Sequence, residues 1–417
     1  MANPRKLLVI DTSYSYEAIE KRELKSSVIC RDLDGYFEHV WSVHPFATLV
    51  TSKEHSPEYG RPIVYSINKK HTFVEGKIGI SPIIKKIPII NFLLSQIDVF
   101  LFLICLIRRE KISVIRVGDP LYLGIFGYCL SKLTKTPFVV RIGSNNRKIR
   151  ETTGRCIMPR LFMSIRQEEF LEQFVLTHAD LVAGANRDNL KFAINSGANP
   201  DRCTLFRYGN LIDAAHFSAP ITRPSPEPRY SCSSFLLCIA RLESVKKVDD
   251  VIRVLADIRK SDFYLQALLI GDGSERNSLE QLAIKLGVQD QVVFCGNRDQ
   301  NWLSTIIPHA QMVLSPHTGR ALTEAALGAA PIVAYDIDWQ SELIESGVTG
   351  ELVEFGEWEA LSDATVKFLK DRSYARKMGD QVRLRALEMM DPVKLNQHEI
   401  NQYEKLIRVR SYKRQVI

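Results

Sequence analysis

Two basic side chains stand close together in the second half of the chain, where an apolar run gives way to a helix-like stretch. The segment ARLESVKK follows the run FLLCI and contains Arg241 and Lys246. Cations at a strand end, next to the free N–H groups and positive dipole of a helix N-terminus, favour binding of a diphosphate. A solvated basic loop would explain the same two residues, and their spacing alone does not separate the explanations.

Two further loops place glycines at the ends of apolar runs. One reads GDGS and follows LQALLI, and the other reads CGNR and follows QVVF. Glycine lets the backbone approach a ligand closely, so Gly273, Gly296 and Asn297 are candidates to line the same site. A tight turn with Ser274 as helix N-cap is an equally good explanation of the first loop, and a plain turn explains the second.

A longer loop leads from an apolar run into a helix of small residues. It reads SPHTGRALTEA and contains His317 and Glu324. A carboxylate at Glu324, expected in the first helical turn, could accept hydrogen bonds from two neighbouring ribose hydroxyls, or it could simply favour the helix N-terminus. The other candidates from this loop are Gly319, Arg320, Ala321 and Leu322.

Short apolar runs alternate with amphipathic stretches along both halves of the chain, which is typical of parallel strands covered by helices on both faces. In the first half the expected strands are 6–11, 112–117, 138–142, 181–183 and 204–206. In the second half they are 235–240, 264–271, 291–296, 311–315 and 331–335, with helices at 248–260, 275–286 and 321–328. Ligands bind beyond the carboxyl ends of such strands, so the chemistry is expected in the loops that follow them.

The length of 417 residues fits two domains of about 200 residues each. The segment 216–234 carries four prolines and little periodicity, so it is the expected linker. It separates an N-terminal domain, 1–215, from a C-terminal domain, 235–390. The remainder, 391–417, is expected to be a helix that returns to the first domain and ends in a basic tail.

Composition and charge exclude some classes of function. A net charge of +7 is too small to argue for nucleic acid and is compatible with anionic substrates or an anionic membrane surface. The eight cysteines are scattered, without zinc spacing, and are expected to be reduced core residues of a cytoplasmic protein. The first residues run straight into an apolar strand without a signal-peptide pattern.

Residues 235–370 resemble the donor domain of the retaining glycosyltransferases of family 4. The resemblance rests on several stretches in the family's order and spacing: IARLESVKK, LLIGDGSERNSLEQLAIKLG, VVFCGN, VLSPHTGRALTEAALGAAPIVAYD and SELIESGVTGELVE. Weaker matches, ADLVAGANRDN and FRYGNLIDAAHF, extend it to about two-thirds of the chain. The resemblance implies that Arg241 and Lys246 hold the donor diphosphate and assist catalysis, and that Glu324 binds the ribose.

The sequence departs from the family at several positions. Pro316 stands where the first glutamate of the Glu-x7-Glu motif would fall, and His317 follows it as a potential substitute. Lys247 replaces a glycine that usually follows the family lysine. In the first half, DTSYSY replaces a glycine-rich loop, and the loop VRIGSN lacks a histidine that is common near the sugar.

What the resemblance implies is an α/β protein of the GT-B fold, two doubly wound Rossmann-like domains facing a cleft. It implies transfer of a hexose from a nucleotide-sugar, UDP- or GDP-linked, with retention and without a further cofactor or metal. The acceptor would be a glycan or lipid-linked saccharide in surface polysaccharide synthesis. The acceptor-side candidates are Asp11, Asp119, Arg141 and Gly143, which could equally be capping or turn residues. Alternatives are another GT-B enzyme, such as a sugar-nucleotide epimerase, and a binding homologue with weak catalysis.

The segment 82–110 is largely apolar, with Lys85-Lys86 near its start and Arg108-Arg109 near its end. Pro88, Asn91, Gln96 and Asp98 interrupt it, which disfavours a membrane span. Two structures remain open, a helix with one face shallowly in lipid at the inner face of a membrane and an ordinary buried helix.

Overall fold

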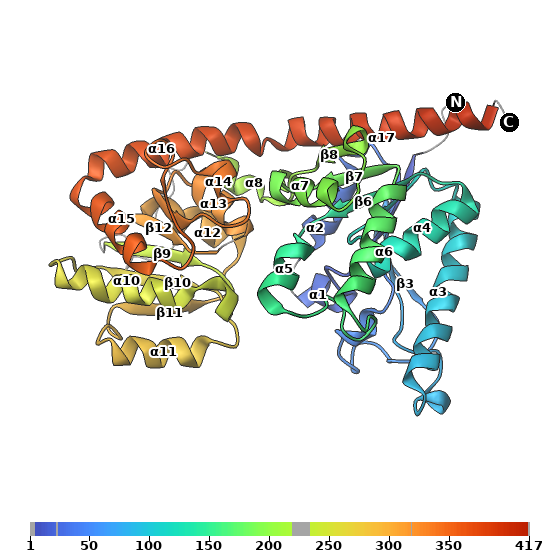
Figure 1. Ribbon diagram of the computed structural model, residues 1–417, viewed down its shortest axis with the longest axis horizontal. Coiled ribbons are helices and arrows are strands. Elements are labelled where there is room, and N and C mark those ends of the chain that lie inside the picture. The colour runs from blue at the N-terminus through green and yellow to red at the C-terminus, as the bar shows by residue number, and fades with distance from the viewer. Residues whose placement is uncertain (1–4, 22–23, 219–233, 318, 416–417) are drawn as a thin grey trace. The chain divides into compact units, whose positions relative to one another are not determined.

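The computed structural model describes residues 5–21, 24–218, 234–317 and 319–415. The chain divides into two compact units, which are described one at a time (Figure 1). Unit 1 comprises Met1–Arg207 and Val393–Ile417, and unit 2 comprises Tyr208–Pro392. Unit 1 therefore ends at Arg207 rather than at residue 215. Most of the expected linker lies outside the described residues, since 219–233 are not described.

Unit 1 is built on an eight-stranded sheet with the order β3-β4-β2-β1-β5-β6-β7-β8. β3 runs antiparallel to β4, and the other neighbours are parallel. The strands are β1 (Lys6–Ile10), β2 (His39–His44), β3 (Ile63–Asn68), β4 (His71–Glu75), β5 (Val114–Val117), β6 (Phe138–Ile142), β7 (Leu181–Gly184) and β8 (Cys203–Leu205).

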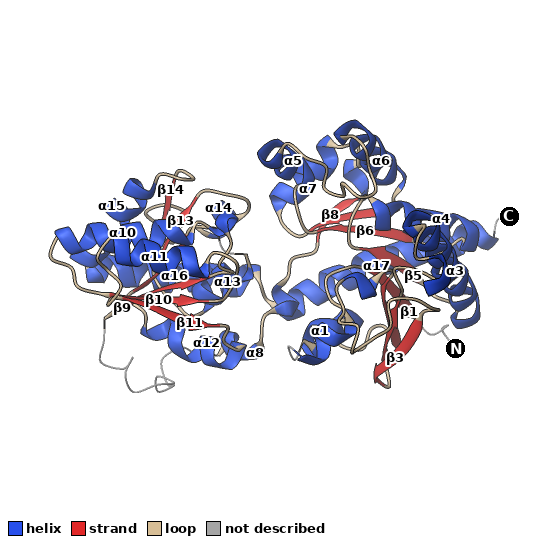
Figure 2. Cartoon of the chain, turned by 90° about the horizontal axis from the view of Figure 1, so that it is seen from below, coloured by secondary structure: helices blue, strands red, loops and turns tan. Residues whose placement is uncertain are grey.

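Helices cover both faces of this sheet, as Figure 2 shows. One face packs against long helices through a core that includes Leu8, Val99, Leu103 and Leu130. The other face packs against the C-terminal helix through Tyr403 and its neighbours. The helices are α1 (Tyr16–Lys21), α2 (Lys25–Ile29), α3 (Pro88–Glu110), α4 (Tyr122–Thr134), α5 (Asn146–Thr153), α6 (Ile165–His178), α7 (Arg187–Asn195) and α17 (Pro392–Gln415).

The C-terminal helix α17 satisfies a buried charge in the sheet of unit 1. Arg116 lies on β5 and is 4% exposed. Its Nη1 donates to Glu399 Oε1 at 2.9 Å and to the Tyr403 hydroxyl at 3.3 Å, and both partners belong to α17. The last part of the chain is therefore an integral element of the first unit.

Unit 2 is built on a six-stranded, entirely parallel sheet with the order β11-β10-β9-β12-β13-β14. The strands are β9 (Phe235–Ile239), β10 (Gln266–Ile270), β11 (Val292–Gly296), β12 (Met312–Ser315), β13 (Ile332–Tyr335) and β14 (Glu351–Val353). The helices are α8 (Ala214–Phe217), α10 (Val248–Lys260), α11 (Arg276–Lys285), α12 (Gln300–Ile306), α13 (Arg320–Leu327), α14 (Gln340–Leu343), α15 (Trp358–Lys370) and α16 (Arg372–Met389).

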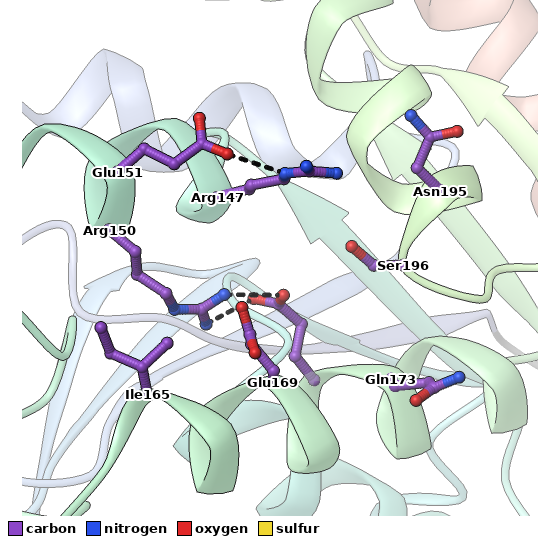
Figure 3. A pocket seen from close by; sticks show the side chains of 9 residues that line it. Arg147, Arg150, Glu151, Ile165, Glu169, Gln173, Asn195 and Ser196 are labelled. Atoms are coloured by element: carbon purple, nitrogen blue, oxygen red, sulfur yellow. Dashed lines mark hydrogen bonds and ion pairs between the residues drawn. The ribbon is translucent and has the colours of Figure 1, made fainter. Parts of the chain in front are cut away.

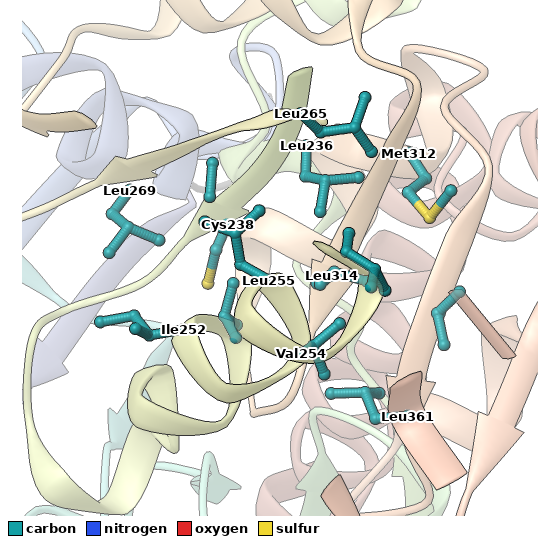
Figure 4. Packing of buried hydrophobic residues seen from close by; sticks show 14 of the residues in the cluster. Leu236, Cys238, Ile252, Val254, Leu255, Leu265, Leu269, Met312, Leu314 and Leu361 are labelled. Carbon is teal, nitrogen blue, oxygen red and sulfur yellow. The ribbon is translucent and has the colours of Figure 1, made fainter. Parts of the chain in front are cut away.

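Alternate residues of β9 serve two separate cores, as expected for a strand buried on both faces. Leu236 and Cys238 pack with α10 and α15 in one core (Figure 4). Phe235 and Leu237 pack with α12, α13 and α16 in the other. The chain runs from β9 outward through β10 and β11, then returns to the opposite side of β9 for β12. Adjacent crossovers diverge at this point, so a crevice is expected at the carboxyl ends of β9 and β12.

The expected strands are present within a residue or two, but four strands were missed: β2, β3, β4 and β14. The cysteine expectation was wrong in part. The seven described cysteines are free thiols, but among them only Cys238 is buried, and Cys105 is exposed on α3.

Candidate functional site

The loop after β9 presents two cations that form no ion pair within the described part of the chain. Leu242, 1% exposed, anchors the loop in the core, while Arg241 is exposed and Lys246 is half-buried. Across the described residues, neither cationic side chain has a hydrogen-bond or ion-pair partner. Burial and, after it, the positive charge of Arg241 lower the pKa of Lys246, partly offset by Asp338. The two cations are therefore close enough to repel each other, and an anion placed between them would relieve that repulsion.

The first glycine loop, GDGS, packs against this cation loop. A Cβ at Gly271 would meet the carbonyl oxygen of Ala240 at 1.9 Å, and one at Gly273 would meet that of Leu242 at 2.3 Å. Both glycines are thus required for close packing of one backbone segment on another. The N-cap expectation for Ser274 was wrong. The N-cap of α11 is Glu275, and the Ser274 hydroxyl donates to Glu243 at 3.4 Å.

Gly296 and Asn297 belong to the second glycine loop, CGNR, at the end of β11. Gly296 adopts a φ of 66°, in the left-handed region that favours glycine, and bridges to Gly271. Asn297 is exposed. This geometry lets the backbone turn sharply at the sheet edge and leaves the Asn297 amide accessible.

The loop after β12 is tied to the cation loop by His317. Its Nδ1 lies 3.0 Å from the carbonyl oxygen of Val245, and its Nε2 lies 2.7 Å from Asp338 Oδ2. The two partners are a backbone carbonyl and a carboxylate, so both ring nitrogens are held by the protein itself. His317 therefore links three loops, and in this arrangement neither ring nitrogen is left to replace the carboxylate that Pro316 displaces.

Glu324 lies in the second turn of α13, so the expectation of a first-turn carboxylate was wrong. It is 2% exposed, and its Oε1 accepts from Arg320 Nε at 3.1 Å, one helical turn away. Arg320 Nη1 also reaches the carbonyl oxygen of Leu211 at 3.4 Å. A buried carboxylate with one oxygen in this pair has its second oxygen available for a further donor.

The N-terminus of α13 adjoins this carboxylate. Gly319 is exposed, and a Cβ there would meet nothing within 4 Å. Among the described residues, no side chain caps the N-terminus of α13 or of α10, so their first N–H groups face the loops after β12 and β9 without a described side-chain acceptor. Ala321 is half-buried, whereas Leu322 is 0% exposed in the core, so its side chain cannot contact a ligand.

The acceptor-side candidates of unit 1 also lie at strand ends. Asp11 follows β1 and binds Arg31 Nη2 at 2.7 Å, while its Oδ1 accepts from the backbone N–H of Ser13. Asp119 follows β5, the neighbour of β1, and accepts from the N–H of Leu121 at 2.8 Å. Burial raises the pKa of Asp119 to about 7. These two carboxyl groups therefore flank the point in unit 1 where successive crossovers diverge.

Arg141 and Gly143 lie one strand further along, on β6 and just after it. Arg141 Nη2 donates to the carbonyl oxygens of Phe206 and Arg207, at 3.0 and 3.3 Å. This guanidinium holds the end of β8 in place, which is a structural role. Gly143 is exposed in the turn before Asn145, the N-cap of α5.

A buried polar cluster at the ends of β2 and β4 was not anticipated. Lys77 Nζ donates to Glu75 Oε1 at 2.9 Å and to the hydroxyl of Ser56, and all three side chains are at most 2% exposed. Burial lowers the pKa of the neighbouring His44 to about 4, although the carboxylates of Asp11 and Glu75 oppose the shift. The signal in the sequence is a polar residue at the end of each strand, His44 on β2 and Glu75 on β4, but neither strand is among those that the sequence predicts.

A cavity of about 520 Å³ opens among α5, α6 and α7 of unit 1 (Figure 3). None of the predicted site residues lines it. Its floor is an internal ion network in which Arg150 binds both oxygens of Glu172 at 3.1 Å and Glu168 at the same distance. Because these charges satisfy one another, the cavity offers less to an anion than the cation loop of unit 2. No group of three or more His, Cys, Asp or Glu within the described ranges could hold a metal ion.

Comparisons with known proteins agree with this geometry. Residues 225–385 match the family model of the glycosyl transferases group 1. The match spans the cation loop, both glycine loops and α13, and it leaves all of unit 1 outside.

Two curated relatives match over half of the chain or less. N-acetyl-alpha-D-glucosaminyl L-malate synthase of Bacillus anthracis is 28% identical over 209 residues, covering 49% of this chain and 53% of that protein. A GDP-mannose-dependent alpha-(1-6)-phosphatidylinositol monomannoside mannosyltransferase of Mycobacterium tuberculosis is 25% identical over 38% of this chain and 45% of its own length. The chain thus spans about half the length of these relatives.

Solved structures match over nearly the whole chain. Sucrose-phosphate synthase of Thermosynechococcus elongatus superposes with a TM-score of 0.74 and 16% identity, covering 97% of this chain and all of that one. The Anabaena protein HepE, solved with UDP, gives a TM-score of 0.69 with 17% identity, covering 96% and 100%. At such identities the likeness shows the fold, and the predicted GT-B fold of two Rossmann-like α/β units is confirmed.

Proposed function

We propose that the chain is a glycosyltransferase that moves a hexose from a nucleotide-sugar to a glycan or lipid-linked saccharide. The observation that carries the proposal is the pair Arg241 and Lys246, which form no ion pair among the described residues, beside the N-termini of α10 and α13, for which no side-chain cap is described. Such a site suits a diphosphate, since the cations and N–H groups are already oriented toward an anion. The group 1 match over the same residues supports it.

The two cations would act on the leaving group. As the bond between the sugar and the diphosphate breaks, negative charge accumulates on the terminal phosphate. Arg241 and Lys246 would stabilise that charge. Their attraction to the phosphate strengthens as its negative charge grows, so they would bind the transition state more tightly than the bound donor. Glu324 would accept hydrogen bonds from the ribose hydroxyls through the carboxylate oxygen that Arg320 does not bind.

The finer features of the proposal have separate support. A UDP-sugar donor is favoured by the solved relative that binds UDP, and a GDP-sugar donor by the GDP-mannose-dependent relative. Retention of anomeric configuration, and a reaction without a metal, rest on the resemblance to family 4. Surface polysaccharide synthesis in the cytoplasm is proposed on the same basis.

A thermal-shift screen against UDP-, GDP-, ADP- and dTDP-sugars identifies the donor, since a ligand that binds only the folded state raises its melting temperature. The stabilising donor is then incubated with candidate saccharide acceptors, and the anomeric coupling constant of the product is read by NMR. A product of retained configuration supports the proposal in full. Conversion of the donor to an epimer without acceptor would indicate an epimerase, and absence of both transfer and donor hydrolysis would indicate a binding homologue.

A further inference from the structure

The first half of helix α3 exposes apolar side chains and buries polar ones. Asn91, Ser95 and Gln96 are all at most 5% exposed. The opposite face is apolar, and its side chains recur at helical spacing. Together with two residues before the helix, the exposed set, termed here the outer stripe, is Ile83 (89%), Ile87 (52%), Ile89 (73%), Ile90 (49%), Leu93 (54%), Leu94 (41%), Ile97 (55%) and Leu101 (54%). Water favours the reverse arrangement, so this face is expected to be covered.

The buried polar residues fix α3 to the body of unit 1. Asn91 Oδ1 accepts from the N–H groups of Ile80 and Ser81, at 2.7 and 3.1 Å. Ser95 Oγ donates to the carbonyl oxygen of Lys77 at 2.8 Å. Gln96 Nε2 donates to the carbonyl oxygen of Pro45 at 3.2 Å. The orientation of the helix about its own axis is therefore set by specific hydrogen bonds, and the outer stripe cannot turn inward without breaking them.

The contacts of α3 argue against both a membrane span and a fully buried helix. By length and composition α3 could cross a membrane. However, its inner face belongs to the main core of unit 1 through Val99, Leu103 and Leu106, so it cannot leave the sheet as a separate span. The buried-helix expectation is also wrong, because the outer stripe is exposed. In Figures 1 and 2, α3 lies along an edge of its unit.

The charges around the outer stripe are of one sign. Every exposed charged side chain between residues 82 and 111 is basic: Lys85, Lys86, Arg108, Arg109 and Lys111. The acidic residues of the segment are not exposed to the same degree, since Asp98 is half-buried and Glu110 is paired with Lys6 at 2.8 Å. Basic groups at both ends of an apolar stripe complement a surface that has an apolar interior and anionic headgroups.

We propose that the outer stripe of α3 docks on an anionic lipid bilayer, with the helix lying in the headgroup region and the basic residues contacting the headgroups. Unit 1 would then be held at the membrane surface reversibly, by partial insertion of the stripe. The proposal concerns binding only, and the measurement below uses neither donor nor acceptor, so its failure leaves the proposed activity intact.

The test is co-sedimentation of the purified full chain with vesicles of phosphatidylcholine alone or mixed with phosphatidylglycerol, at 0.1 M and 1 M salt. Binding is expected to the anionic vesicles at low salt and to weaken at high salt, since the Debye length falls from about 10 Å to about 3 Å. Leu93→Glu is expected to weaken binding at least tenfold. Leu384→Glu, at a side chain that is 61% exposed on α16 of unit 2, is the matched control and should bind as the wild type does.

Depth of insertion provides a second readout that does not depend on the amount bound. With vesicles containing brominated lipids, Ile97→Trp is expected to gain fluorescence that the lipid quenches, whereas Leu384→Trp should not be quenched. Circular dichroism and melting temperature establish that each variant is folded. Lack of binding by folded wild type at low salt would overturn the proposal. So would binding that resists carbonate extraction, or a concentration-dependent dimer that Leu93→Glu abolishes, because these outcomes indicate a span or a second copy of the chain.

Discussion

Neutralising either cation of the β9 loop tests the donor site most directly. Lys246→Gln and Arg241→Gln remove one charge each while keeping a side chain of similar length. A charge-assisted hydrogen bond contributes about 1.5–3 kcal/mol net, which corresponds to about a 10- to 150-fold rise in Kd for a nucleoside diphosphate. Lys246 is half-buried and Arg241 is exposed, so the loss is expected to be greater for Lys246.

The repulsion between the two cations adds a signature that a general loss of structure would not produce. In the free protein, burial and Arg241 lower the pKa of Lys246, so its charge is lost at lower pH than that of an ordinary lysine. Affinity for the diphosphate is therefore expected below this lowered pKa and to fall as pH rises through it. In Arg241→Gln one source of the shift is gone, so the fall should move to higher pH. The same substitution should leave the free protein as stable as the wild type, or more so.

The assay is isothermal titration calorimetry between pH 7 and pH 10, with the nucleoside diphosphate that gives the largest thermal shift. Lys247→Gln is the matched control, because it removes the adjacent lysine of the same loop and should leave the affinity unchanged. Equal affinity of wild type, Lys246→Gln and Arg241→Gln would refute the reasoning. A loss in Lys247→Gln as large as that in Lys246→Gln would refute it as well, since only general charge attraction would then remain.

Three further predictions concern other residues of the two units. Glu324→Gln should weaken binding of the nucleoside diphosphate about tenfold and leave that of inorganic pyrophosphate unchanged, because pyrophosphate has no ribose; calorimetry with both ligands checks this, and equal losses would return Glu324 to a structural role. Gly273→Ala should lower the free energy of unfolding by more than about 2 kcal/mol, since its Cβ would lie 2.3 Å from the Leu242 carbonyl oxygen. Gly319→Ala is the control, because a Cβ there meets open space and should leave the stability nearly unchanged. Urea denaturation measures both, and similar stabilities of the two variants would contradict the packing argument. The pKa of Asp119 is about 7 in the folded state, against an ordinary value of 3.8, so the folded state holds the proton more tightly than the unfolded state does. The free energy of unfolding should therefore fall as pH rises from about 4 to 7, by at most about 4 kcal/mol. Asp119→Asn should remove this fall in unfolding curves measured across that range, and an unchanged pH profile would contradict the assignment.

Most of the strands that the sequence predicted are short, nearly continuous apolar runs. β6 and the helix α10 occur at the expected residues, and β9 and β12 within one residue of them. Of the four strands that the sequence did not predict, β2 and β4 carry buried polar residues, whereas β3 and β14 have no buried side chain. On β2, Ser42 is 1% exposed because it accepts from Arg31 at 2.9 Å. On β4, His71 is 1% exposed and lies 3.3 Å from Asp32. Side chains distant in sequence supply these partners, so no local pattern could predict them.

The candidate site shows the same division. The loop positions of Arg241 and Lys246 follow from strand and helix boundaries, which the sequence predicts well. The fixation of His317 between Val245 and Asp338 does not, because it depends on which strands are neighbours and on the left-handed backbone at Asp338, where φ is 53°. Likewise, the exposed side of α3 could not be predicted, since the polar partners of Asn91 and Gln96 come from other loops.

The pairing of Arg116 with α17 has a consequence for biosynthesis. The ribosome delivers the sheet of unit 1 early and the residues that neutralise its buried guanidinium almost last, with all of unit 2 in between. A buried charge deprived of its partner costs about 3–5 kcal/mol, a large fraction of the stability of a domain. The nascent first unit must therefore wait in an incomplete state while the second one folds. A stop codon or proteolytic cut shortly before Glu399 would accordingly harm the unit that was synthesised first.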